Sequence, residues 1–142
     1  MRKLGLEFEV VVPGVEELAG GDPEFEVLEN ARRKARAVER DGMVIACDTD
    51  VVLDGKALGK PADAAETRRY LDRMSGRAHT VMSGLVILAG GEEHSGLERT
   101  TVVFKGLSDA DKDRYVDFGE WRGRSGGYSA AISEGHRPCS DP

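Results

Sequence analysis

The sequence predicts an α/β fold, in which helices flank a mixed β-sheet. Residues 24–40 and 62–75 carry apolar side chains at the three- and four-residue spacing of amphipathic helices. Strand-like apolar runs at residues 43–53, 78–89 and 100–105 alternate with these helices. The chain has 142 residues, of which 39% are hydrophobic, which is enough for one domain with its own core.

The first third of the chain contains a predicted strand, a helix and a second strand. Residues 6–12 place apolar side chains at alternate positions, which predicts a strand that ends before Pro13. The inner face of the helix at residues 24–40 is predicted to consist of Phe25, Leu28, Ala31, Ala35 and Val38. Residues 43–47 are continuously apolar, which predicts a strand buried on both faces and a buried free thiol at Cys47.

A tight hairpin is predicted at residues 54–55, an Asp-Gly pair between two strand-like runs. With a two-residue loop, Leu53 pairs with Lys56. The same register, continued, places Thr49 opposite Lys60 and brings Lys60 close to Asp48.

The second half of the chain has clear helix caps. Asp63 is expected to cap the helix at residues 62–75, with Glu66 at the capping-box position. A polar turn at residues 90–96 is expected to join the strands at 78–89 and 100–105. Ser108 is expected to cap a short helix at 109–118, with Asp111 at its box position.

Composition excludes several classes of protein. There are 26 acidic and 20 basic residues, and this net charge of −6 opposes a role in general nucleic-acid binding. No apolar run approaches the roughly 20 residues that span a membrane, and no signal peptide is apparent. Two cysteines cannot form a disulfide framework, so we expect a cytoplasmic protein.

Asp48 is the most informative candidate residue, because it follows five apolar residues on a predicted strand. An ionised carboxylate there needs a partner or a metal ion, and Asp50 shares its strand face. Two such carboxylates suit Mg²⁺, although two solvated aspartates at the end of a strand fit equally well. Lys60 and Arg77 are candidate phosphate ligands, the alternatives being a solvated turn lysine and a cap on the preceding helix.

Two further segments have both a functional and an ordinary interpretation. Lys34 lies at the rim of the apolar stripe, where a lysine often extends to solvent without any role. The loop containing Glu17 is acidic and would ordinarily be solvated. Arg122 and Arg124, among the glycines of residues 123–127, suggest either an anion-binding nest or a flexible loop.

Taken in order, these fragments resemble one family, the Maf-like or septum-formation-inhibitor-like nucleotide pyrophosphatases. The resemblance extends from Leu4 to about Tyr128. Its fragments are residues 8–11, 13–17, 31–35, 47–49, 53–55, 59–63, 75–79, 83–84, 103–104, 107–109, 119–120 and 126–128. No single fragment is decisive, and the order and spacing of the set make the match specific.

The resemblance implies an α/β fold related to inosine-triphosphatase-like enzymes, often dimeric. It implies hydrolysis of a nucleoside triphosphate, dTTP or UTP as the first guess, to the monophosphate and pyrophosphate. Asp48 corresponds to the family's proton acceptor and, with Glu17, would bind a divalent cation, Mg²⁺ or Mn²⁺. Thr49 corresponds to the residue associated with base selection, and Lys34 and Lys60 correspond to the family's lysines near the triphosphate.

The sequence departs from the family pattern at both ends. The S-x-S-P-R-R loop that relatives carry near their start has no counterpart, because Met1 aligns near the end of the following helix. No glutamine follows Tyr128 where relatives use one to select the base. We therefore expect a partial Maf-like domain at residues 1–128, truncated at its start, and a divergent or disordered tail at residues 129–142. The alternative function is a catalytically impaired or non-catalytic nucleotide-binding or interaction remnant of the family.

Overall fold

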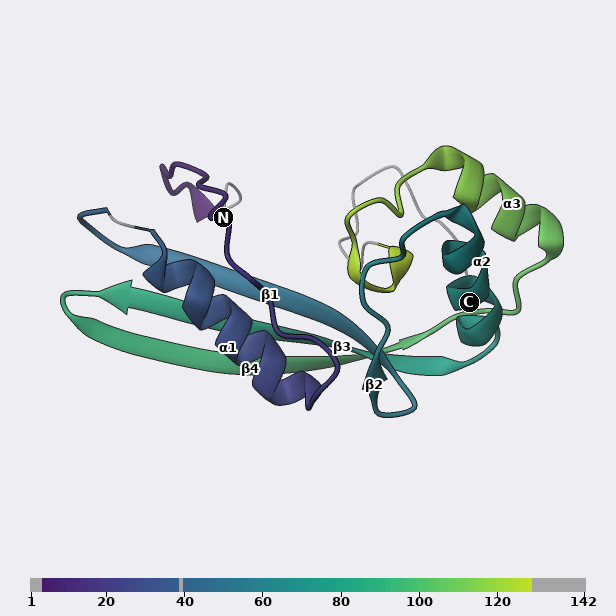
Figure 1. The fold of residues 1–142 in the computed structure, drawn as a ribbon, viewed down its shortest axis with the longest axis horizontal. Coiled ribbons are helices and arrows are strands. Elements are labelled where there is room, and N and C mark those ends of the chain that lie inside the picture. The colour runs from purple at the N-terminus through teal and green to yellow at the C-terminus, as the bar shows by residue number, and fades with distance from the viewer. Residues whose placement is uncertain (1–3, 39, 129–142) are drawn as a thin grey trace.

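The computed structural model describes residues 4–38 and 40–128 and confirms the α/β class. Figure 1 shows a long twisted sheet with helices packed at both of its ends. The elements, in chain order, are α1 (Pro23–Arg36), β1 (Val44–Leu53), β2 (Lys56–Ala57), α2 (Ala64–Met74), β3 (Ala78–Ala89), β4 (Glu92–Val103), α3 (Asp109–Phe118) and the short 3₁₀ helix η2 (Ser125–Gly127).

The sheet has the strand order β2-β1-β3-β4, and the strands in the described residues pair antiparallel throughout. β1 and β3 pair from Val44↔Leu88 to Val52↔Thr80, so they lie side by side over most of their lengths. β4 was expected to begin at residue 100, but it begins at Glu92 and pairs with β3 along its full length. The early part of β4 is polar and exposed, so pairing with β3, rather than an apolar pattern, makes it a strand.

The hairpin between β1 and β2 confirms the predicted turn. Leu53 pairs with Lys56, and both loop residues have positive φ, 52° at Asp54 and 77° at Gly55, as a type I′ turn requires. β2 ends at Ala57, however, so the expected pairing of Thr49 with Lys60 does not form. Lys60 instead lies on the segment that leads from β2 to α2.

The strand predicted at residues 6–12 is wrong, because no strand forms there. Phe8, Val10 and Val12 are exposed to 41%, 72% and 89% of their surface. Alternation of apolar side chains favours a strand only where a neighbouring strand offers backbone partners. No strand among the described residues pairs with this segment.

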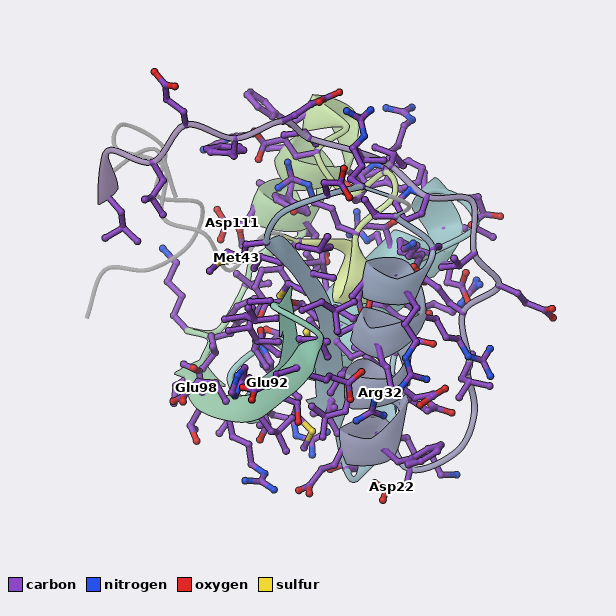
Figure 2. The ribbon with its side chains drawn as sticks, turned by 90° about the vertical axis from the view of Figure 1, so that its left-hand side faces the viewer. Asp22, Arg32, Met43, Glu92, Glu98 and Asp111 are labelled. Atoms are coloured by element: carbon purple, nitrogen blue, oxygen red, sulfur yellow. The ribbon has the colours of Figure 1, made fainter. Side chains whose placement is uncertain are left out.

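Helix α1 begins where the sequence predicts, but it ends four residues early, and its buried face overlaps the predicted one only at Ala31 and Ala35. Asp22 caps it by accepting a hydrogen bond from the Glu24 backbone, and Figure 2 shows Asp22 at its first turn. Val27 is fully buried, whereas Phe25 is 58% exposed, which corrects the predicted stripe. The complete set of buried residues in α1 is Pro23, Glu26, Val27, Asn30, Ala31 and Ala35.

Close packing of α1 on the sheet depends on Gly84 in β3. A Cβ atom at Gly84 would lie 2.5 Å from the Val27 carbonyl oxygen, so only glycine allows this approach. Ala31 and Ala35, both fully buried, let the next turns of the helix approach the sheet as well. The result is a small core between α1 and the sheet, where these two alanines meet Val86.

A larger core lies on the other face of the sheet, towards α2 and α3. Its buried members are Val51, Leu53, Leu58, Tyr70, Leu71, Met74 and Val81. The two cores are displaced along β1, with α1 over its first part and α2 and α3 at the far end (Figure 1). Residues 48–50 of β1 therefore lie where one core gives way to the other.

The displacement leaves one face of early β1 open, which corrects two predictions. Ile45 is 38% exposed, so residues 43–47 are not buried on both faces. Cys47 has an exposed thiol for the same reason, and it is a free cysteine. Among the described residues, no helix combines the length and the apolar character needed to cross a membrane.

Candidate active site

Asp48 lies at the centre of a partly buried polar contact between β1 and α1. Lys34 Nζ donates to Asp48 Oδ1 at 2.7 Å, and Asn30 Nδ2 donates to Asp48 Oδ2 at 3.3 Å. The Asp48 side chain is only 11% exposed. The prediction that this carboxylate needs a partner is therefore confirmed, and the alternative of a merely solvated aspartate does not fit.

Glu17 and Lys60 extend this contact into a chain of four alternating charges. Lys34 Nζ lies 2.9 Å from Glu17 Oε1, and Lys60 Nζ lies 3.5 Å from Glu17 Oε2. The order along the chain is Asp48, Lys34, Glu17 and Lys60. Lys60 was expected near Asp48 through strand pairing, but it reaches the group through Glu17 instead.

The contacts within this group favour the charged forms of Glu17 and Lys34. The hydrogen bond from Lys34 lowers the pKa of Glu17 despite partial burial. Burial alone would lower the pKa of Lys34, but its hydrogen bonds to Asp48 and Glu17 outweigh burial and raise that pKa. Lys34 therefore stays protonated, and the two carboxylates that it holds converge on one ammonium group.

Asn30 is a site residue that the sequence analysis missed. Its side chain is fully enclosed, with the residue 2% exposed. Oδ1 accepts from the Leu18 backbone N–H at 2.7 Å, and Nδ2 donates to the Leu18 carbonyl at 3.1 Å as well as to Asp48. One amide thus fixes both the loop that carries Glu17 and the carboxylate of Asp48. The sequence signal that could have identified Asn30 is its position on the helix, one turn before Lys34.

Asp50 shares the strand face of Asp48 but has a different partner. Ser125 Oγ donates to Asp50 Oδ1 at 2.6 Å and accepts from the Val51 backbone N–H at 3.1 Å. Burial, opposed by the Ser125 hydrogen bond and reinforced by nearby carboxylates such as Asp48, raises the pKa of Asp50. Asp50 therefore attaches residues 123–128 to β1, a contact that sequence reasoning did not find.

Thr49 leaves β1 on the face opposite Asp48. Its hydroxyl lies 3.0 Å from the Ser83 hydroxyl on the neighbouring strand. The edge of β1 that faces away from β3 has no paired strand among the described residues before Val52. At this open edge, one cleft reaches both faces of β1. This cleft has a volume of about 600 Å³ and is lined by Lys34, Cys47, Asp48, Thr49, Val51, Lys60, Val81, Ser83, Thr100, Gly123, Arg124, Ser125 and Tyr128.

Arg77, the remaining predicted site residue, lies apart from this cleft. Its guanidinium forms hydrogen bonds of 2.6 and 3.3 Å with the carboxylate of Asp54, in the turn of the β1–β2 hairpin. That pairing raises the pKa of Arg77, and the guanidinium supports the turn. His79 is buried, and its ring contacts Phe104 and Tyr128 edge-on, as expected for a structural histidine.

The donor set at Glu17 and Asp48 suits a divalent cation that is shared with a phosphate. Mg²⁺ in proteins is commonly held by one or two carboxylates together with substrate phosphates. Within residues 4–38 and 40–128, no group of three or more His, Cys, Asp or Glu side chains is arranged to hold a metal. Glu17 and Asp48 are the carboxylates that could hold such a cation together with a phosphate.

Comparisons with known proteins found one matching family model and several similar proteins. A family model described as "Maf-like protein" matches residues 1–136. A dTTP/UTP pyrophosphatase of Deinococcus radiodurans is 43% identical over 129 residues, covering 88% of this chain and 66% of the relative. One of Symbiobacterium thermophilum is 43% identical over 133 residues, covering 90% and 69%. One of Pelotomaculum thermopropionicum is 38% identical over 151 residues, covering 98% and 79%. The chain thus spans about two thirds of the length of the first two.

Proposed function

The chain belongs to the Maf-like protein family, and on that premise we propose that it is a nucleoside triphosphate pyrophosphatase. It hydrolyses dTTP or UTP to the monophosphate and pyrophosphate, as the names of its relatives suggest. The observation that carries the proposal is the chain of charges formed by Asp48, Lys34, Glu17 and Lys60. It combines a largely buried carboxylate, that of Asp48, with lysines in a cleft large enough for a nucleotide.

Asp48 is the proposed catalytic residue. Cleavage between the α- and β-phosphates requires a water molecule opposite the leaving pyrophosphate and a group that takes its proton. Asp48 Oδ1 is held tightly by Lys34 at 2.7 Å, whereas Oδ2 is held by a longer hydrogen bond of 3.3 Å from Asn30. Oδ2 is thus the more weakly held oxygen and is proposed to orient the water and accept its proton, while Oδ1 would be released when Lys34 turns to a phosphate.

Lys34 and Lys60 are proposed to bind the triphosphate. Both ammonium groups already lie against carboxylates, and phosphate oxygens can replace these partners without leaving the lysines uncompensated. Glu17 and Asp48 would then be free to hold a divalent cation, Mg²⁺ or Mn²⁺. When bound, that cation supplies positive charge to the phosphate oxygens.

Thr49 is proposed to contact the base. It lies on the other face of β1 from the charged residues, so a nucleotide in the cleft would pass around the open edge of the strand. The adjacent hydroxyls of Thr49 and Ser83 can each donate and accept hydrogen bonds. A thymine or uracil carries both a hydrogen-bond donor and hydrogen-bond acceptors along one edge.

The test is pyrophosphate release from dTTP and UTP, compared with ATP and GTP, in the presence of Mg²⁺, Mn²⁺ or a chelator. Asp48→Asn keeps the side-chain shape and should lower kcat by about 100-fold or more. Asp41→Asn, at an exposed turn before β1, is the matched control and should leave the rate unchanged. Equal rates for both variants would remove Asp48 from its role. Nucleotide binding without turnover in the unaltered protein would instead support the non-catalytic alternative.

Two finer points belong to the same proposal. A cytoplasmic location suits an enzyme whose substrates are nucleoside triphosphates. A homodimer, implied by the family resemblance, would be detected by sedimentation equilibrium, and a monomer at all accessible concentrations would rule it out.

A further inference from the structure

The lysines of the cleft are already neutralised by neighbouring carboxylates. Lys34 lies against Asp48 and Glu17, and Lys60 lies against Glu17. A triphosphate is strongly anionic, so its binding benefits from a cation that has no carboxylate to give up. A cationic side chain of this kind would strengthen the binding of a triphosphate in the cleft.

Arg124 meets this requirement. It lines the same cleft and is exposed. Among the residues that the structure describes, its guanidinium has no hydrogen-bond or ion-pair partner. Its neighbour Arg122 differs, because the Arg122 guanidinium lies over the Trp121 ring at 4.7 Å from the centroid. Two arginines that look alike in the sequence thus have different surroundings.

The backbone that carries Arg124 is fixed beside the proposed site. The next residue, Ser125, accepts from the Val51 N–H and donates to Asp50. Gly126 N–H then donates to the Gly59 carbonyl at 2.7 Å, next to Lys60 in the chain. Gly126 has φ of 67°, and a Cβ atom there would lie 2.6 Å from Val51 Cβ, so this segment follows β1 closely.

We propose that Arg124 is a further substrate-binding residue, whose guanidinium binds a phosphate group of the nucleoside triphosphate. An arginine presents a planar fork of donors that fits two phosphate oxygens at once. Because no carboxylate among the described residues offsets its charge, Arg124 gives the cleft an attraction for phosphate that Lys34 and Lys60 lack. The inference rests on the proposed function and adds to it a residue for the phosphate subsite.

The experiment compares Arg124→Gln and Arg124→Lys with Arg122→Gln as the matched control. Steady-state kinetics on dTTP with Mg²⁺ gives KM and kcat, and inorganic pyrophosphate and thymidine serve as competing ligands. We expect KM for dTTP to rise about tenfold in Arg124→Gln, the size expected for loss of one charged hydrogen bond. Arg124→Lys should recover part of this loss, and Arg122→Gln should behave like the unaltered protein.

The two competing ligands show which part of the nucleotide Arg124 contacts. In Arg124→Gln, inhibition by pyrophosphate should weaken in parallel with KM, whereas inhibition by thymidine should not change. Unchanged KM, or equal weakening of both inhibitors, would overturn the assignment to a phosphate. If the unaltered protein shows no turnover, the proposed catalytic function fails, and calorimetric binding of pyrophosphate to the same variants still decides the role of Arg124. Thermal melting confirms that each variant is folded.

Discussion

Replacing Asn30 with alanine should loosen the Glu17 loop from α1, since the Asn30 side chain is buried and binds both backbone groups of Leu18 in that loop. The substitution removes three hydrogen bonds, with the Leu18 N–H, the Leu18 carbonyl and Asp48. A buried group left without a partner costs about 1–3 kcal/mol. Leu18 is only partly buried, so water can replace some of these contacts. We therefore expect the free energy of unfolding to fall by about 2–4 kcal/mol.

The assay is urea unfolding followed by far-ultraviolet circular dichroism, together with hydrogen exchange at the Leu18 amide. Arg33→Ala is the matched control, because Arg33 also joins α1 to this loop, through an exposed hydrogen bond of 3.1 Å to the Glu16 carbonyl. The control should cost no more than about 1 kcal/mol. The reasoning is refuted if Asn30→Ala costs no more than Arg33→Ala, or if the Leu18 amide keeps its protection.

Two further substitutions test the packing around the site. Asp50 has a pKa raised above its usual 3.8 by burial, so its contribution to stability is present below that pH and is lost as pH rises through the folded-state pKa. Asp50→Asn keeps a hydrogen-bond acceptor for Ser125 and has no buried charge, so its free energy of unfolding should exceed that of the unaltered protein near neutral pH. This gain should vanish in acid. Urea unfolding at a series of pH values measures the difference, and a difference that stays constant with pH would contradict the prediction. Gly84→Ala should lower the free energy of unfolding by about 1–3 kcal/mol, because its Cβ would lie 2.5 Å from the Val27 carbonyl oxygen. Thermal melting checks this, and an unchanged Tm would show that α1 shifts at little cost.

Local chemistry in the sequence was enough to predict several elements of this fold. Asp63 and Ser108 both cap helices through their side chains, as their positions indicate. Residues 54–55 form the predicted turn because an Asp-Gly pair accepts the positive φ angles that the hairpin requires. In each case the residues that determine the structure are within a few positions of one another.

The errors have a common physical origin in distant partners. Residues 6–12 alternate like a strand but find no strand to pair with, whereas residues 92–99 show no apolar pattern and become a strand beside β3. The candidate site shows the same contrast. The need of Asp48 for a partner was evident from its local sequence, but the roles of Asn30 and Ser125 depend on residues that lie at least twelve positions away. A single sequence does not reveal such contacts.

The charge network and the proposed function together predict that a metal ion and a triphosphate bind cooperatively. In the free protein, Lys34 and Lys60 compensate Glu17 and Asp48, so no charge in this group is left unpaired. A triphosphate alone would take the lysines and leave two carboxylates uncompensated, and a cation alone would do the reverse; each costs free energy in a partly buried site. Together they satisfy all four side chains, so each should raise the affinity for the other by the same factor. Calorimetric titration of Mg²⁺, with and without a non-hydrolysable triphosphate, measures this coupling, and independent binding would contradict the exchange of partners.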